Sequence, residues 1–191
     1  MSYSGLSVGE AIEKRRSTGD FSSEAMSLIE LSRLLHYATG ITEKRYCLRA
    51  APSAGALYPI ELYAVINNVE GLATGVYHYS IGEHSLDVLR KADFRKEMVQ
   101  HCLGQEMVGQ ANVAFIMTAL FHRSRWKYQE RTLRYTLLEA GHIAQNIYLT
   151  ATSMGLGACA VGAFSDDDIN PLLRIDRTRE SVVYLVVVGN I

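Results

Sequence analysis

The sequence predicts an α+β fold, in which a β-sheet is flanked by helices, and three observations predict it. Residues 76–79 and 86–89 have the pattern of a β-hairpin that turns at Gly82. Residues 182–188, VVYLVVV, are apolar or aromatic without alternation, which predicts a strand buried on both faces. Apolar residues repeat at helical spacing from about Tyr128 to Met154, which predicts one helix much longer than the rest.

Two helices are expected in the first forty residues. Val8, Ala11 and Ile12 fall at helical spacing, so a short helix should end near residues 15–17. Ser27 and Glu30 have the spacing of a capping box, in which the serine side chain accepts a backbone N–H and the glutamate reaches back. The helix that they open should end at Gly40 and turn these residues inward: Leu28, Leu31, Leu34, Leu35 and Ala38.

The middle of the chain alternates between strands and short helices. Residues 61–66 should form a strand before the hairpin, and residues 94–103 should form a helix after it. A buried strand is expected at residues 113–121, and Ser165 with Asp168 marks a further helix start.

The predicted long helix has two weakly polar rows. The first consists of Leu133, Leu137, Ala140, Ala144, Ile147, Ala151 and Met154, and the second of Leu138, Gly141, Gln145, Tyr148 and Thr152. A helix with two such faces is normally covered on both sides, and in a chain this small a second subunit is the simplest cover. The alternative is the ordinary central helix of a monomer.

Composition excludes several classes of protein. The 191 residues are expected to form one domain, 1–191, and a net charge of −1 leaves no basic field for nucleic acid or an anionic membrane. The longest apolar runs are too short for a transmembrane helix, and the start does not have the pattern of a signal peptide. Three isolated cysteines favour neither a disulfide framework nor a zinc site, so we expect no metal and a cytoplasmic protein.

A loop of small residues between Pro52 and Pro59 is the most informative segment. Both prolines fix φ, and the small side chains of residues 53–56 let the backbone approach a flat or anionic partner. The alternative is a surface turn before a strand.

The segment Arg15-Arg16-Ser17 is a candidate anion site at the end of the first helix. Arginine offers planar, charged donors that suit phosphate, and a serine hydroxyl can add a further donor. The alternative is a solvated basic pair.

Together these segments resemble the nitroreductase-like flavin enzymes, and most closely their SagB-type dehydrogenase branch. Four blocks in the same order carry the resemblance: AIEKRRS at 11–17, PSAGALYP at 52–59, the WKY, RY, LEAGH and QN segments at 126–146, and GLGACAVGAF at 155–164. The resemblance implies a three-layer α/β/α fold with a mixed, mainly antiparallel sheet and the long helix at a homodimer interface.

The resemblance also implies FMN as the cofactor and assigns residues to it. Arg15, Arg16 and Ser17 match positions that hold the phosphate and ribityl chain. Relatives use the loop against the flavin ring of the partner subunit, so FMN is shared across the interface; the matching residues are Pro52, Ser53, Ala54, Gly55 and Leu57. Ala160, Val161 and Gly162 match the segment near flavin N5.

Three departures from the family pattern affect cofactor binding. Relatives often have a basic residue at the position of Gly19 and a polar amide at the position of Ala56. Many continue past the last strand with a tail that supplies a basic phosphate contact; here that contact is expected either to be absent or to come from Arg131 or Arg134.

Lys127 and Tyr128 match a lysine–tyrosine pair in relatives that oxidise azoline rings of modified peptides. Such an oxidation removes a C–H proton while hydride passes to flavin N5. A lysine acts as a base only where burial or a nearby cation lowers its pKa from about 10. Arg123 and its basic neighbours would supply that positive field, and Tyr128 would relay a proton or orient the ring. The alternative is a solvent-exposed lysine at a helix start.

The leading hypothesis is therefore a homodimeric FMN oxidoreductase of the SagB type that transfers hydride between a small-molecule or peptide substrate and flavin N5. A second hypothesis is a reductase of nitro compounds, quinones or flavins with NAD(P)H as electron donor. A third is an FMN-binding protein without catalytic turnover.

Overall fold

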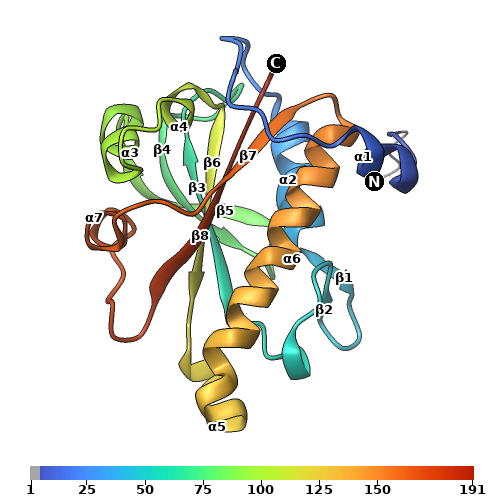
Figure 1. Cartoon of the computed structure of the whole chain (residues 1–191), viewed down its shortest axis with the longest axis vertical. Helices are drawn as coiled ribbons and strands as arrows, with labels where there is room; N and C mark the ends of the chain where they lie inside the picture. The colour runs from blue at the N-terminus through green and yellow to red at the C-terminus, as the bar shows by residue number, and fades with distance from the viewer. Residues whose placement is uncertain (1–4) are drawn as a thin grey trace.

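The computed structural model describes residues 5–191, which form a six-stranded sheet covered by helices on both faces (Figure 1). The order across the sheet is β5-β4-β3-β6-β8-β7, and every pairing between these strands is antiparallel. Their bounds are β3 Ile60–Ile66, β4 Gly75–Ser80, β5 Ser85–Lys91, β6 Val113–Ala119, β7 Gly157–Val161 and β8 Ser181–Gly189.

Two hydrophobic cores lie on opposite faces of this sheet, because successive strand residues point to opposite sides. On β3, Leu62 and Ala64 belong to the core beneath α2 (Leu28–Thr39) and α6 (Thr132–Ser153). Tyr63 and Val65 belong to the other core. That core is covered by α3 (Arg95–His101), α4 (Met107–Gln110) and α7 (Asp166–Leu172). The expected three layers are confirmed (Figure 1).

The remaining elements surround α6. Helix α1 (Val8–Lys14) packs near its C-terminal end, and α5 (His122–Tyr128) with the 3₁₀ turn η2 (Gln129–Arg131) leads into its start (Figure 1). A small hairpin, β1 (Ile41–Glu43) and β2 (Leu48–Arg49), precedes the 3₁₀ turn η1 (Ala54–Ala56) in the Pro52–Pro59 loop. The sequence patterns did not predict this hairpin, whose strands have three and two residues.

The predicted start of the long helix was wrong. Tyr128 ends the separate helix α5, and the long helix begins at Thr132. Gln129 causes the break, because its φ of 49° and ψ of −120° lie outside the helical region. Lys127 and Tyr128 therefore lie on their own short helix.

One prediction of burial was wrong, and one apolar row of α6 is only partly buried in the single chain. The Ser27–Glu30 capping box is present, but Leu28 is 51% exposed. In the first row of α6, Ala140, Ala144 and Ile147 are buried, whereas Leu133 and Leu137 are about half exposed. In the first half of α6, this row of apolar residues therefore lies outside the core of the single chain.

No helix within residues 5–191 is both long and apolar enough to cross a membrane.

Candidate active site

The Pro52–Pro59 loop has a strained backbone that its surroundings hold in place. Gly55, Ala56 and Tyr58 have positive φ angles of 65°, 53° and 48°. Such angles cost a residue with a side chain about 1–2 kcal/mol each, so they persist only where contacts impose them. The Tyr58 N–H donates to Ser53 Oγ at 2.9 Å, and Arg123 Nη1 donates to the Tyr58 carbonyl at 3.0 Å.

The side chains of Lys127 and Tyr128, both on α5, reach Gly55 in the middle of this loop. A Cβ atom added to Gly55 would lie 2.5 Å from the Tyr128 hydroxyl and 2.7 Å from Lys127 Nζ. The Tyr128 ring also meets the Tyr135 ring edge to face, with centroids 5.0 Å apart. The Lys127 side chain is exposed, whereas Tyr128 is half-buried. The structure thus brings two predicted catalytic groups and one predicted flavin-contacting residue together.

Arg123 explains why α5 lies against the loop. It is one helical turn before Lys127, and its guanidinium pairs with the buried Glu61 of β3 as well as binding the Tyr58 carbonyl. The charge that we expected to act on Lys127 is therefore balanced by a carboxylate. Arg123 joins α5, the sheet and the loop.

His78 of β4 completes this ion pair, since its Nε2 lies 2.9 Å from Glu61 Oε2. Burial would raise the pKa of Glu61, but the hydrogen bond from His78 and the charge of Arg123 outweigh it and lower that pKa. The same hydrogen bond raises the pKa of His78, against the effect of burial. Both groups are therefore favoured in their charged forms.

Glu139 of α6 lies beneath the loop, and it was not among the residues predicted for the site. It is 4% exposed, and burial raises its pKa to about 7, opposed by a hydrogen bond from Ser53 and the charge of Arg49. Arg49 in turn stacks on the Tyr58 ring, with 4.5 Å from its Cζ to the centroid. The available signal was an acidic residue on the buried side of an amphipathic helix, next to Ala140.

A second group of predicted site residues meets at Tyr148, near the other end of α6. The Tyr148 hydroxyl lies 2.9 Å from Ser17 Oγ and accepts the Ala160 N–H at 2.7 Å. Arg15 lies over the Tyr148 ring, 5.2 Å from the centroid. The segment after α1 is also hydrogen bonded to β7, where the Thr18 N–H donates to the Ala158 carbonyl at 3.0 Å. The sequence pattern placed Tyr148 in the second, weakly polar row of the helix and gave no sign of this contact.

The residues of the β7 segment differ in what they can offer a ligand. The Val161 side chain is buried in the core beneath α7, so its backbone alone is available. Gly162 is exposed, and an added Cβ would meet only the Tyr184 ring, at 4.0 Å. Open surface therefore begins at Gly162.

The two groups lie at opposite ends of α6 (Figure 1). Glu139 and Tyr148 are nine residues apart on this helix, which corresponds to about 13 Å along its axis. Arg131, at the start of α6, is about 25 Å from Tyr148 by the same measure. The structure therefore does not bring Arg131 near Arg15 in the same chain. Arg16 does not join the group around Tyr148 either, because its Nη1 donates to the backbone carbonyls of Glu13 and Arg15.

The remaining predicted loop residues border a small cavity on α6. It has a volume of about 260 Å³ and is lined by Pro52, Ser53, Ala54, Tyr135, Leu138, Glu139 and His142. Leu57 follows η1 and is half-buried.

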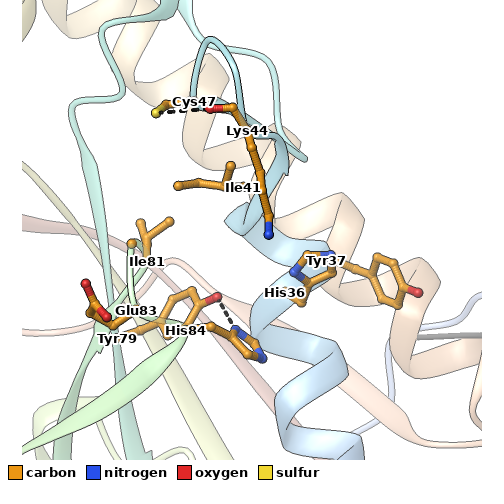
Figure 2. A pocket seen from close by; sticks show the side chains of 10 residues that line it. His36, Tyr37, Ile41, Lys44, Cys47, Tyr79, Ile81, Glu83 and His84 are labelled. Carbon is orange, nitrogen blue, oxygen red and sulfur yellow. Dashed lines mark hydrogen bonds between the residues drawn. The ribbon is translucent and has the colours of Figure 1, made fainter.

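A separate cavity of about 570 Å³ lies between α2, the β1–β2 hairpin and the β4–β5 turn (Figure 2). Within it, His84 is held by Tyr79, whose hydroxyl is 2.7 Å from Nδ1, and by Ser32, whose Oγ is 2.8 Å from Nε2. None of the predicted site residues lines this cavity. Among the described residues, no three histidine, cysteine or acidic side chains are grouped so that they could hold a metal ion.

The chain is similar to a known protein family over nearly its full length. The model of the Nitroreductase family matches residues 12–190. The protein named "Putative nitroreductase MJ1384" from Methanocaldococcus jannaschii is 37% identical over 184 residues, covering 96% of this chain and 91% of the relative.

Two further matches are with a trifolitoxin-processing protein and with a chain of a microcin synthetase complex. The trifolitoxin-processing protein TfxB from Rhizobium leguminosarum bv. trifolii is 31% identical over 175 residues. The match covers 85% of this chain but only 47% of TfxB, so the chain spans about half the length of that relative. A chain in the structure of the Escherichia coli microcin synthetase McbBCD complex with truncated pro-MccB17 bound has a TM-score of 0.81. It is 24% identical, with 100% of this chain and 75% of that chain covered, and it shows a shared fold.

Proposed function

This chain belongs to the nitroreductase family, and we propose that it is an FMN-dependent oxidoreductase of the SagB type, which oxidises azoline rings in a modified peptide. The expected resemblance to this family and to its peptide-processing branch is confirmed by the comparisons. Because the chain belongs to this family, its general class is that of an oxidoreductase. The substrate, the cofactor and the roles of individual residues are proposals.

The convergence of Lys127 and Tyr128 on Gly55 carries the proposal. The lysine amine and the phenol hydroxyl come from adjacent residues, and both lie at Gly55 of the loop that is expected to contact the flavin ring. FMN, when bound, supplies the acceptor for hydride. In our proposal the Lys127 amine accepts the proton from the substrate carbon, and the Tyr128 hydroxyl orients the ring being oxidised.

The residues of the Tyr148 group fit the other end of FMN. Within residues 5–191, no carboxylate pairs with Arg15, so its guanidinium is available for an anion beside the exposed Ser17. Gly162 leaves room for a flat ring close to its backbone. We therefore assign the phosphate to Arg15 and Ser17, with Ala160–Gly162 beside the ring, and leave Arg16 as a helix-capping residue.

The separation of the two groups along α6 supports a flavin that is shared by two subunits. Leu133, Leu137 and Leu138 are each about half exposed on α6, and Trp126 of α5 is 71% exposed. Exposed apolar residues gathered on one element are typical of an interface. A second subunit would cover this surface and would also exclude water from Lys127, as a lysine base requires. The phosphate contact expected from Arg131 could then reach the partner's flavin.

The proposal is tested by cofactor content and by one lysine substitution. We expect the purified protein to bind FMN stoichiometrically, and Lys127→Ala to keep FMN while losing azoline oxidation by at least a hundredfold. Lys96→Ala, on the exposed side of α3, is the matched control and should behave like the wild type. A protein that fails to take up FMN, or a Lys127→Ala variant with normal turnover, contradicts the proposal. Rapid flavin reduction by NAD(P)H followed by reoxidation with nitroarenes would instead support the general reductase.

A further inference from the structure

The cavity between α2, the β1–β2 hairpin and the β4–β5 turn is not used by the proposed reaction (Figure 2). Its volume of about 570 Å³ falls within the usual range for small-molecule sites, which is roughly 300–1,000 Å³. Such sites combine apolar or aromatic walls with a few convergent polar groups. The residues that line this cavity provide both.

Aromatic rings and isoleucines form the walls of the cavity. The rings of His36 and Tyr79 each meet the His84 ring edge to face, with centroids 5.7 Å apart in both pairs. Ile41 of β1 and Ile81, which follows β4, add apolar surface (Figure 2). Because rings pack well against other rings and against branched apolar side chains, these walls favour a flat aromatic ligand.

His84 is a fixed part of the wall and has no free polar atom. Its Nδ1 lies 2.7 Å from the Tyr79 hydroxyl and its Nε2 lies 2.8 Å from Ser32 Oγ, so both ring nitrogens already have partners. Burial and the neighbouring His36 lower the pKa of His84, which favours the neutral ring. Burial also raises the pKa of Tyr79 to about 12, so its hydroxyl stays protonated. The wall is therefore uncharged and held in place without a ligand.

Lys44 and His36 are the polar groups that remain available in the cavity. The Lys44 side chain extends from the β1–β2 hairpin toward the His36 ring (Figure 2). Within residues 5–191, no acid forms a salt bridge with Lys44, and the His36 ring nitrogens have no hydrogen-bond partner. Glu83, the acid in the lining, lies on the other side of the cavity from Lys44 (Figure 2). An ammonium group and an imidazole N–H without a carboxylate between them favour an anionic ligand group.

We propose that this cavity is a binding site for a flat aromatic carboxylate. The ring of the ligand packs among His84, Ile41 and Ile81, and its carboxylate accepts hydrogen bonds from Lys44 and His36. None of the residues predicted for the flavin or for catalysis lines the cavity, so the site is separate from both groups along α6. The inference goes beyond the proposed function and does not depend on it.

Three probes separate the contribution of the ring from that of the charge. Cinnamate carries both, cinnamamide carries the ring without the charge, and acetate carries the charge without the ring. Affinities for the purified full chain are measured by titration calorimetry, and backbone amide shifts in NMR spectra show where each probe binds. We expect cinnamate to bind at least about tenfold more tightly than the other two, since it alone uses both parts of the cavity. The shifted amides should lie at residues 36–47 and 79–84.

Lys44→Met tests the charge, because methionine keeps an apolar stem of similar length and removes the ammonium group. Cinnamate should bind this variant about tenfold more weakly, and cinnamamide should bind it like the wild type. Lys91→Met is the matched control. It removes the same charge from an exposed residue of β5 that does not line the cavity, and its affinity for cinnamate should not change.

The inference is overturned if cinnamate binds no more tightly than either of the other probes, or if Lys44→Met keeps the wild-type affinity. Amide shifts in the Pro52–Pro59 loop instead of the cavity would also overturn it. The titrations are repeated with added FMN, which should leave the affinity for cinnamate unchanged. If FMN abolishes cinnamate binding, the carboxylate occupies the flavin site and the inference fails. If cinnamate binds at the cavity but the protein takes up no FMN, the proposed function fails and this inference stands.

Discussion

Replacing Gly55 by alanine should lower substrate turnover strongly while lowering the stability of the fold only slightly. In Gly55→Ala the new Cβ would lie 2.5 Å from the Tyr128 hydroxyl and 2.7 Å from Lys127 Nζ. Ordinary van der Waals contact begins near 3.4 Å, so the hydroxyl must retreat by about 0.9 Å. Both contacted atoms are the ends of flexible side chains, and they can move without disturbing the core.

The expected effects on stability and on turnover therefore differ in size. An alanine at φ +65° costs about 1 kcal/mol of backbone strain, which lowers Tm by about 2–4 °C in a chain of this length. If Lys127 and Tyr128 act as proposed, a displacement of about 1 Å in their reactive atoms can cost a hundredfold in rate. We expect a small loss of stability and a large loss of turnover.

Gly71→Ala is the matched control, because Gly71 has a similar φ of +72° with no atom within 4 Å of an added Cβ. Thermal unfolding and substrate turnover of both variants are compared with the wild type. The two variants should lose similar stability, and Gly55→Ala alone should lose about a hundredfold in turnover. Equal turnover in the two alanine variants would refute the assignment of Lys127 and Tyr128.

The other predictions concern the ion pair beneath the loop and the exposed face of α6. Arg123→Met leaves the buried Glu61 with His78 as its remaining partner and should destabilise the fold by about 2 kcal/mol in urea unfolding, whereas Arg177→Met, at an exposed pair, should cost under about 1 kcal/mol. Because Glu61 raises the pKa of His78, the stabilisation is fully present below pH 6.5 and is lost as the pH rises through the raised pKa. His78→Asn should remove that decline, and an unchanged pH profile would contradict the role of His78. Leu137→Lys should shift the molar mass measured by light scattering from dimer to monomer; a wild-type protein that is already monomeric would contradict the interface.

Elements with a strong local signal were predicted well. The capping box at Ser27, the hairpin around Gly82 and the apolar strand at 182–188 all depend on residues close together in the sequence, and the structure contains each of them. The start of α6 was predicted wrongly, because apolar spacing continues across Gln129 although the backbone does not. Such a break depends on one residue's dihedral angles, which periodicity does not report.

The candidate site was predicted in pieces. Ser17 and Ala160 were named from separate blocks, but the hydroxyl that joins them belongs to Tyr148, which the helical pattern assigned to a weakly polar row. Glu139 was missed for a related reason. An acid on the buried side of a helix is a local signal, but the sequence does not show which loop lies over it.

The sequence by itself determined the family and a sheet flanked by helices, and it named the segments proposed to carry chemistry, because these follow from local patterns and from the order of motifs. Only the tertiary structure decided which segments meet. It placed Lys127 and Tyr128 at Gly55, and Arg15 with Ser17 at Tyr148, on opposite ends of one helix. The reason is physical: contacts between residues far apart in the chain depend on how helices pack on the sheet, and that packing is a property of the whole core.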